Sequence, residues 1–176
     1  TVDLNNNKQI LYAVHLYAGD NEDRIVPPGW GTDNDSWLYR RNVATGPSGS
    51  MTQYETTRQR QLDAFREGLL YPYLKNERVL MCPLDNKVDN LFLQRSIYIT
   101  SYVMNGATVG FPPGGSKPRG PYKMTAFKPI GVLLWETDET TPFFFNDASS
   151  FPDEGISERH GNGATIGLIS ASTEWV

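Results

Sequence analysis

The sequence predicts an α+β domain, in which an N-terminal helix packs on an antiparallel β-sheet with long loops. Helical periodicity lies at the start of the chain, and strand-like segments come later. Glycine and proline are frequent, with 16 and 12 of 176 residues, which is typical of a loop-rich domain. Because helix precedes strands without regular alternation, an α+β arrangement is favoured over repeated βα units. The length fits one domain, so residues 1–176 are expected to form a single unit.

The expected N-terminal helix covers residues 4–18. Its apolar residues share one stripe with spacings of three, four and seven: Ile10, Leu11, Val14, Tyr17 and Ala18. Gly19 is expected to end the helix, as C-terminal glycines often do. His15 falls on the polar side, where a structural or solvent-facing role is expected because a lone imidazole lacks partners for catalysis or metal binding.

The remaining elements follow in order. A second helix is expected over residues 55–69, stopped by Tyr71-Pro72 because proline disfavours helix in the preceding residue. Strands are expected at 79–82, 96–104 and 130–135, and a C-terminal hairpin pairs 164–169 with 173–176. Loops are expected at 20–50, 110–121 and 138–155, where turn-forming residues gather.

Charge, cysteine count and hydrophobicity exclude several classes of protein. The net charge is −4, and no basic stripe is present, so nucleic acid is not an expected partner. Cys82 is the single cysteine, which excludes a disulfide within the chain. No apolar run approaches the roughly 18 residues needed to cross a bilayer. The chain starts abruptly in helix-like sequence, and we expect that an N-terminal segment was removed.

Four short segments, in order along the chain, resemble those of bacterial prepilin-like proteins, a group abundant in planctomycetes and verrucomicrobia and related to type II secretion pseudopilins. The segments are Leu4-Asn5-Asn6-Asn7-Lys8-Gln9-Ile10, Met81-Cys82-Pro83-Leu84-Asp85, Arg95 with Ser101-Tyr102-Val103-Met104-Asn105, and Arg159-His160-Gly161-Asn162-Gly163. Together they span nearly the whole chain, and their common order makes the resemblance more specific than any one of them.

The resemblance implies a pilin-like fold and a structural role. It implies the soluble head of a type IV pilus or type II secretion pseudopilus subunit, with no enzymatic activity. A membrane helix, absent from this chain, would precede the head and anchor it in the inner membrane. The partners would be homologous pilin or pseudopilin subunits. The expected location is the cell envelope, with the head in the periplasm, or an extracellular filament.

Two positions depart from the family pattern. The family has Asp-Gly after the histidine with nine residues between them, whereas this chain has Ser170-Ala171 there, so a looser or longer final turn is expected. The family also often has a cysteine near the position of Asp3. If that cysteine pairs with the Cys-Pro element in the family, the disulfide is absent here, and Cys82 is expected to be a free buried thiol.

Acidic residues gather in the loops of the second half. Calcium takes six to eight oxygen ligands from carboxylates and loop carbonyls. Major pseudopilins, which these proteins resemble in architecture, carry calcium in their C-terminal loops. A calcium site is therefore one expectation, with Asp138, Asp147 and Asp153 as its ligands. Solvated loop acids are the simpler alternative.

Other side chains have weaker functional signals. His160 precedes two glycines of the Gly-Asn-Gly segment and is expected to hydrogen-bond a neighbouring strand and hold the hairpin. An exported carbohydrate- or surface-binding module is the first alternative function, and a hydrolase using His160 or His15 is the second. The aromatic residues that could form a sugar-binding platform are Trp30, Trp37, Trp135, Phe143, Phe144 and Phe145.

Overall fold

A five-stranded sheet forms the centre of the computed structural model, which describes residues 2–85, 88–110, 120–151 and 153–176. The strands are β1 (Tyr102–Asn105), β2 (Val132–Glu136), β3 (Ser149–Ser150), β4 (Thr165–Leu168) and β5 (Thr173–Trp175). Their order in the sheet is β3-β1-β2-β4-β5. All neighbours are antiparallel except β1 and β3. The α+β class is confirmed, and the sheet is mixed because the two-residue edge strand β3 runs parallel to β1.

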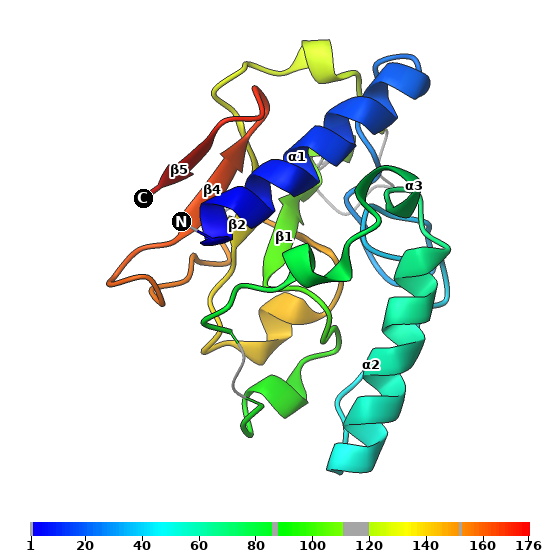
Figure 1. Ribbon diagram of the computed structural model, residues 1–176, viewed down its shortest axis with the longest axis vertical. Coiled ribbons are helices and arrows are strands. Elements are labelled where there is room, and N and C mark those ends of the chain that lie inside the picture. The colour runs from blue at the N-terminus through cyan, green and yellow to red at the C-terminus, as the bar shows by residue number, and fades with distance from the viewer. Residues whose placement is uncertain (1, 86–87, 111–119, 152) are drawn as a thin grey trace.

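The N-terminal helix α1 (Val2–Asp20) lies across the sheet and contacts β4 and β5 (Figure 1). Four residues of the predicted stripe, Ile10, Leu11, Val14 and Ala18, are buried, and Tyr17 is half-buried. Leu11 reaches the sheet at Gly167 of β4, where an added Cβ would lie 2.8 Å from Leu11 Cδ1. A glycine is therefore required for the helix to approach this closely. In the described part of the chain, no helix has the length and apolar character that crossing a membrane requires.

The second helix, α2 (Met51–Arg66), begins and ends earlier than predicted. Ser50 caps its N-terminus by accepting a hydrogen bond from the backbone N–H of Gln53. A buried side chain, Gln61, donates to the carbonyl oxygens of Ala44 and Ser96 at 2.8 Å each. Figure 1 shows the N-terminal end of α2 projecting away from the sheet.

The predicted stop at Tyr71-Pro72 is wrong, because this pair opens a short helix, α3 (Tyr71–Leu74). Proline fits the first turn of a helix, where its missing N–H has no partner to lose. Short 3-10 helices occur at five places in the described residues: η1 (Glu77–Leu80), η2 (Phe92–Gln94), η3 (Gly106–Val109), η4 (Met124–Ala126) and η5 (Pro142–Phe145).

Two predicted strands differ from the structure. The predicted strand at 79–82 is wrong, because η1 forms there with Asn76 accepting from the N–H of Arg78 as its cap. The predicted strand at 96–104 shrinks to β1. Upstream of β1, the N–H of Ile97 bonds the Phe145 carbonyl and the N–H of Tyr98 bonds the Gln61 side chain, so neither joins a sheet ladder.

The C-terminal hairpin is confirmed as β4 and β5. The N–H of Leu168 donates to the carbonyl of Ser172 at 2.9 Å, so residues 169–171 form the turn. This turn is longer than a two-residue Asp-Gly turn, as expected. Ala171 takes the left-handed conformation there, with φ of 64°. The predicted loop at 110–121 lies mostly outside the described residues.

Candidate functional site

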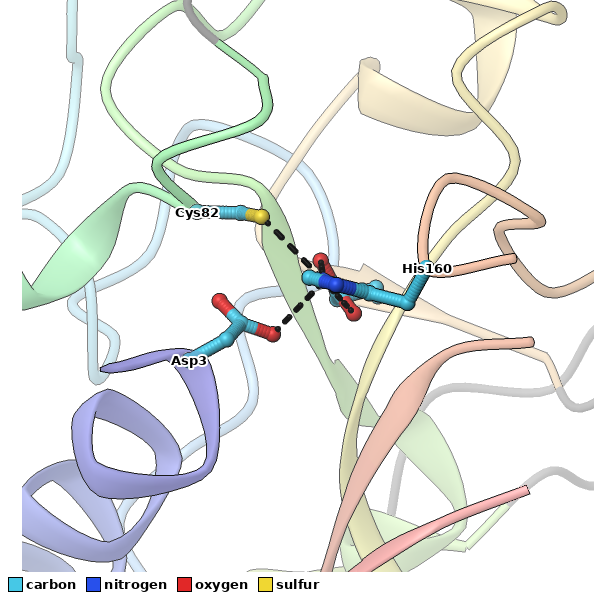
Figure 2. Close-up of side chains that lie close together, drawn as sticks. Asp3, Cys82 and His160 are labelled. Carbon is cyan, nitrogen blue, oxygen red and sulfur yellow. Dashed lines mark hydrogen bonds and ion pairs between the residues drawn. The ribbon is translucent and has the colours of Figure 1, made fainter. Parts of the chain in front are cut away.

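Four side chains from distant segments converge beside the first turn of α1. They are Asp3 in α1, Cys82 after η1, Glu136 at the end of β2 and His160 in the turn before β4. His160 Nε2 lies 3.4 Å from Cys82 Sγ, 3.2 Å from Asp3 Oδ2 and 3.1 Å from Glu136 Oε2. Figure 2 shows Asp3, Cys82 and His160 pointing toward one another. We call these four residues the Asp-Cys-Glu-His cluster.

The two carboxylates of the cluster are held by hydrogen bonds from the sheet. The hydroxyl of Tyr102 donates to Asp3 Oδ1, and Thr165 Oγ1 lies 2.5 Å from Asp3 Oδ2. The backbone N–H of Thr165 donates to Glu136 Oε2 at 2.9 Å. Both carboxylates are almost fully buried, with exposed fractions of 3% and 0%. Their orientation is therefore set by β1 and β4 and not by solvent.

Hydrogen bonds hold the thiol and the backbone of the residue that carries the imidazole. The N–H of Leu84 donates to Cys82 Sγ at 3.4 Å, and Cys82 is buried, as expected for a free thiol. The N–H of His160 donates to the Gly163 carbonyl, and Trp175 Nε1 donates to the His160 carbonyl. The backbone of His160 thus helps to hold the C-terminal hairpin, as predicted, while its side chain enters the cluster.

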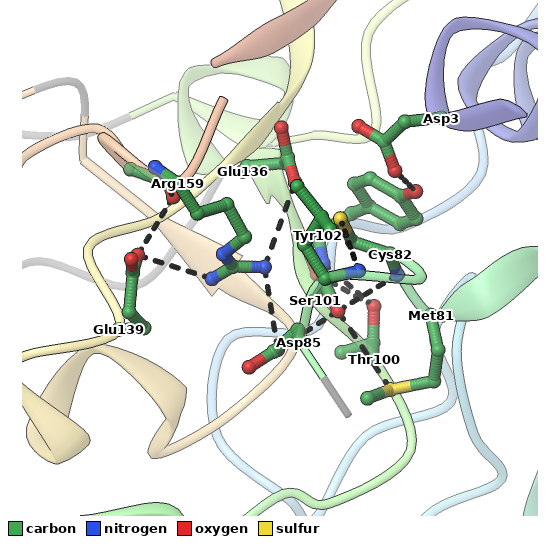
Figure 3. A network of polar contacts seen from close by, with 12 residues as sticks. Asp3, Met81, Cys82, Asp85, Thr100, Ser101, Tyr102, Glu136, Glu139 and Arg159 are labelled. Carbon is green, nitrogen blue, oxygen red and sulfur yellow. Dashed lines mark hydrogen bonds and ion pairs between the residues drawn. The ribbon is translucent and has the colours of Figure 1, made fainter. Parts of the chain in front are cut away.

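A buried ion-pair network lies behind the cluster (Figure 3). Arg95 donates to both oxygens of Asp85, at 2.8 and 3.0 Å. Ser101 Oγ donates to Asp85 at 2.8 Å and accepts from the N–H of Cys82 at 2.9 Å. The bidentate geometry is the strong form of an arginine–carboxylate contact. Asp85 therefore fixes the loop that carries Cys82.

Arg159 connects this network to the cluster. Its guanidinium lies 3.4 Å from Asp85, 3.5 Å from Glu136 and 3.1 Å from Glu139. Its side chain is 6% exposed, so these charges interact with little screening by water. Three carboxylates thus share one guanidinium, and the surroundings of Glu136 remain rich in negative charge.

Burial determines how the cluster titrates. Burial raises the pKa of Glu136, and the nearby charge of Asp3 raises it further. Burial also acts to raise the pKa of Asp3, but hydrogen bonds from Thr165 and Tyr102 outweigh it, and the pKa is lowered. Burial strongly raises the pKa of the Cys82 thiol, so the thiol is protonated at neutral pH. A protonated buried thiol is a poor nucleophile.

The geometry also differs from that of a nucleophile relay. In a relay, one ring nitrogen of histidine faces the nucleophile and the other faces the orienting carboxylate. Here the same nitrogen, Nε2 of His160, faces Cys82 and both carboxylates. His15, the other histidine, is half-buried on α1, with its Nε2 2.8 Å from the Ile169 carbonyl. Its contact fits the expected structural role.

The three predicted calcium ligands lie in separate local arrangements. Asp138 accepts from the N–H and hydroxyl of Thr140. Asp147 is buried, which raises its pKa, and it accepts from the N–H groups of Gly31 and Ser149. Within the described residues, Asp138, Asp147 and the exposed Asp153 are not part of the one group of three or more ligand-type side chains within metal reach. Calcium at these residues stays a prediction.

Three of the six aromatic residues considered for a sugar platform are buried. Trp37, Trp135 and Phe145 are buried, so they offer no ring face to a ligand. Trp30 packs on Phe151 with 4.9 Å between ring centroids. Phe143 is exposed.

Sequence reasoning singled out Cys82 and His160 but did not place them together, and it missed Glu136. A signal for Glu136 was present, because this acid directly follows the apolar run at 130–135. Comparisons with protein-family models, with curated proteins and with solved structures found no match for this chain.

Proposed function

We propose that this chain is the head domain of a pilin-like structural subunit, of a type IV pilus or a type II secretion pseudopilus. The proposal is carried by the placement of α1. One face of this helix packs on the sheet through Ile10, Leu11 and Val14. Its opposite face carries exposed apolar side chains.

The exposed face of α1 suits contact with a second subunit. Val2, Tyr12 and Leu16 are 59%, 51% and 57% exposed. Tyr12 and Leu16 are four residues apart and therefore neighbours on the helix surface. Large apolar side chains that stay in water on an otherwise well-packed helix are candidates for burial in an assembly.

The resemblance to prepilin-like proteins gains support from the buried network. Its segments contribute Cys82 and Asp85, then Arg95 and Ser101, and finally Arg159, and these residues contact one another directly. The segments are far apart in the sequence, but their side chains form one network. Each segment therefore depends on the others, which gives a physical reason for the motifs to occur together. In addition, the resemblance placed a cysteine near the position of Asp3, and Asp3 lies beside Cys82.

In the proposed mechanism, the subunit works by assembly and not by catalysis. Homologous subunits contact one another through their N-terminal helices, and an anchor ahead of the head holds the subunit in the inner membrane before assembly. The sheet and its loops form the outer part of the filament. The head thus displays its loops while α1 connects it to neighbouring subunits.

Cysteine cross-linking of the native gene product in its host cells tests the proposal. Tyr12→Cys is expected to give disulfide-linked dimers under mild oxidation, because the exposed face of α1 meets its neighbour and each subunit then offers one accessible thiol. Arg60→Cys, on the exposed side of α2, is the matched control and is expected to stay monomeric. Equal absence of dimers in both variants, together with recovery of the protein away from the membrane fraction and from filaments, would refute the proposal.

A further inference from the structure

We propose that Asp3, Cys82, Glu136 and His160 bind one zinc ion in a tetrahedral structural site. Imidazole nitrogen, thiolate sulfur and carboxylate oxygen are the three ligand types that zinc takes in proteins. Four protein ligands that leave no open position are typical of a structural site rather than a catalytic one. The inference stands apart from the proposed assembly role, because it concerns how the head itself is held together.

The spacing of the ligand atoms fits a tetrahedron of zinc dimensions. Zinc bonds of about 2.0–2.3 Å at tetrahedral angles place ligand atoms about 3.3–3.6 Å apart. In the structure, His160 Nε2 lies 3.4 Å from Cys82 Sγ, 3.2 Å from Asp3 Oδ2 and 3.1 Å from Glu136 Oε2. All four ligand atoms lie within 4.8 Å of one another. Side-chain shifts on the order of 1 Å or less bring all pairs to the tetrahedral spacing.

Hydrogen bonding alone satisfies this arrangement poorly. Nε2 of His160 carries either one proton or one lone pair, so it makes one directed hydrogen bond at a time. Four heteroatoms from three side chains nevertheless lie within 3.4 Å of it. A central cation interacts with all four ligand atoms at once, and this explains why they face a common point.

Three of the four ligands have an outer partner that orients them, as metal ligands usually have. Tyr102 and Thr165 hold Asp3, and the N–H of Thr165 holds Glu136. The N–H of Leu84 donates to the sulfur of Cys82. Such outer contacts keep the ligand atoms in place before the ion arrives, which lowers the ordering cost of binding.

The negative charge of the cluster favours a dication. Two carboxylates and one thiolate carry three negative charges, and zinc offsets two of them. The guanidinium of Arg159, 3.5 Å from Glu136 and shared with Asp85 and Glu139, offsets part of the rest. Binding requires the Cys82 thiol to lose its proton to solvent as the zinc–sulfur bond forms. The ligand set selects zinc over calcium, because calcium takes oxygen ligands and does not favour sulfur.

The ion would join four segments that are remote in sequence. It would tie the first turn of α1 to the loop after η1, to the end of β2 and to the turn before β4. A single cysteine cannot form a disulfide within the chain, and a metal site gives the same cross-connection with three other ligands. We therefore expect zinc to stabilise the head as a whole.

Metal titration of the purified chain, stripped with a chelator, tests the inference. Zinc chloride is expected to bind with one-to-one stoichiometry in calorimetry and to raise the unfolding temperature. Cobalt(II) is expected to bind in the same place and to show a thiolate-to-metal charge-transfer absorption, which reports a sulfur ligand directly. Absence of both zinc binding and the cobalt spectrum in the folded chain would overturn the inference.

Two variants separate site binding from nonspecific binding. His160→Gln removes a ligand and should weaken zinc binding by more than the roughly 10- to 100-fold that loss of an outer partner costs. His15→Gln is the matched control, because the other histidine lies outside the cluster, and it should bind zinc like the unaltered chain. Circular dichroism confirms folding of each variant. If His160→Gln folds and keeps full affinity, or if Cys82→Ser keeps the cobalt charge-transfer band, the assignment is wrong.

Discussion

Two groups of acids in this chain differ in where their partners come from. Asp138, in the acidic loop, accepts hydrogen bonds from Thr140, only two residues away. Asp3, in the cluster, is held by Tyr102 and Thr165, which are 99 and 162 residues away. The loop acid stabilises its own turn, whereas the buried acid connects distant elements. Asp138 thus serves its own turn, whereas Asp3 lies where the proposed zinc ligands meet.

The largest expected effect is at the buried ion pair. Asp85→Ala leaves the guanidinium of Arg95, 2% exposed, without its carboxylate, so we expect a loss of about 3–5 kcal/mol in the free energy of unfolding. Chemical denaturation measures this loss. Glu67→Ala is the control, because it removes the exposed pair with Arg40 and should change stability little. Similar losses of unfolding free energy in both variants would show that the buried ion pair stabilises the fold no more than the exposed one.

A tyrosine hydroxyl gives a closer comparison. Tyr102→Phe removes a donor to the buried Asp3 and is expected to cost about 2 kcal/mol, a usual value for a hydrogen bond to a charged group. Tyr73→Phe removes a donor to the exposed Asp20 and should leave the unfolding midpoint unchanged. Urea denaturation of both variants, with a metal chelator present, makes the comparison. Equal midpoints for the two variants would contradict it.

The loop acids should show a smaller, pH-dependent effect. Burial acts to raise the pKa of Asp138, but hydrogen bonds from Thr140 outweigh it and lower the pKa below the ordinary 3.8. A lowered carboxyl pKa stabilises the fold above the ordinary pKa, and the gain is lost as pH falls through the folded pKa. Asp138→Asn should therefore reduce stability at neutral pH, by about 0.5 kcal/mol or less after solvent screening, and not at pH 2. Thermal unfolding at both pH values measures this, and an unchanged difference at pH 2 would count against it.

The smallest effect is expected at an exposed loop acid. Asp153→Asn should change the free energy of unfolding by no more than about 0.5 kcal/mol, because surface substitutions away from caps and ion pairs usually do. Denaturation with and without added calcium checks this. Calcium could instead stabilise the unaltered chain and leave Asp153→Asn unchanged. That result would place Asp153 in a metal site, and the loop acids would then no longer differ from the buried acids in this respect.

The spacing of apolar residues predicted the elements whose burial follows from that spacing. The stripe from Ile10 to Ala18 predicted α1, because helical spacing reports which face will be buried. The strand predicted at 79–82 failed, because a 3-10 helix capped by Asn76 runs into it. The strand predicted at 96–104 lost its first part, because the N–H groups of Ile97 and Tyr98 bond to a loop carbonyl and to the side chain of Gln61. Short apolar runs do not reveal such partners.

The candidate site could be predicted only in pieces. The resemblance drew attention to Cys82 and His160, and it marked the position of Asp3. Convergence of these residues depends on how β2, β4 and α1 pack, which no spacing in the sequence encodes. Glu136 is an example. In the sequence it is an acid at the end of a strand, which indicates no function. Only the packing of β4, where the N–H of Thr165 donates to Glu136, makes it part of the site.

The position of Asp3 in the first turn of α1 has a mechanical consequence. A sideways force on that end of the helix reaches the contacts of Asp3 before it reaches the apolar contacts of Ile10, Leu11 and Val14. Peeling would therefore break the polar attachment first, whereas tension along the helix axis would load the whole row of contacts at once. The head should therefore resist shear better than peeling.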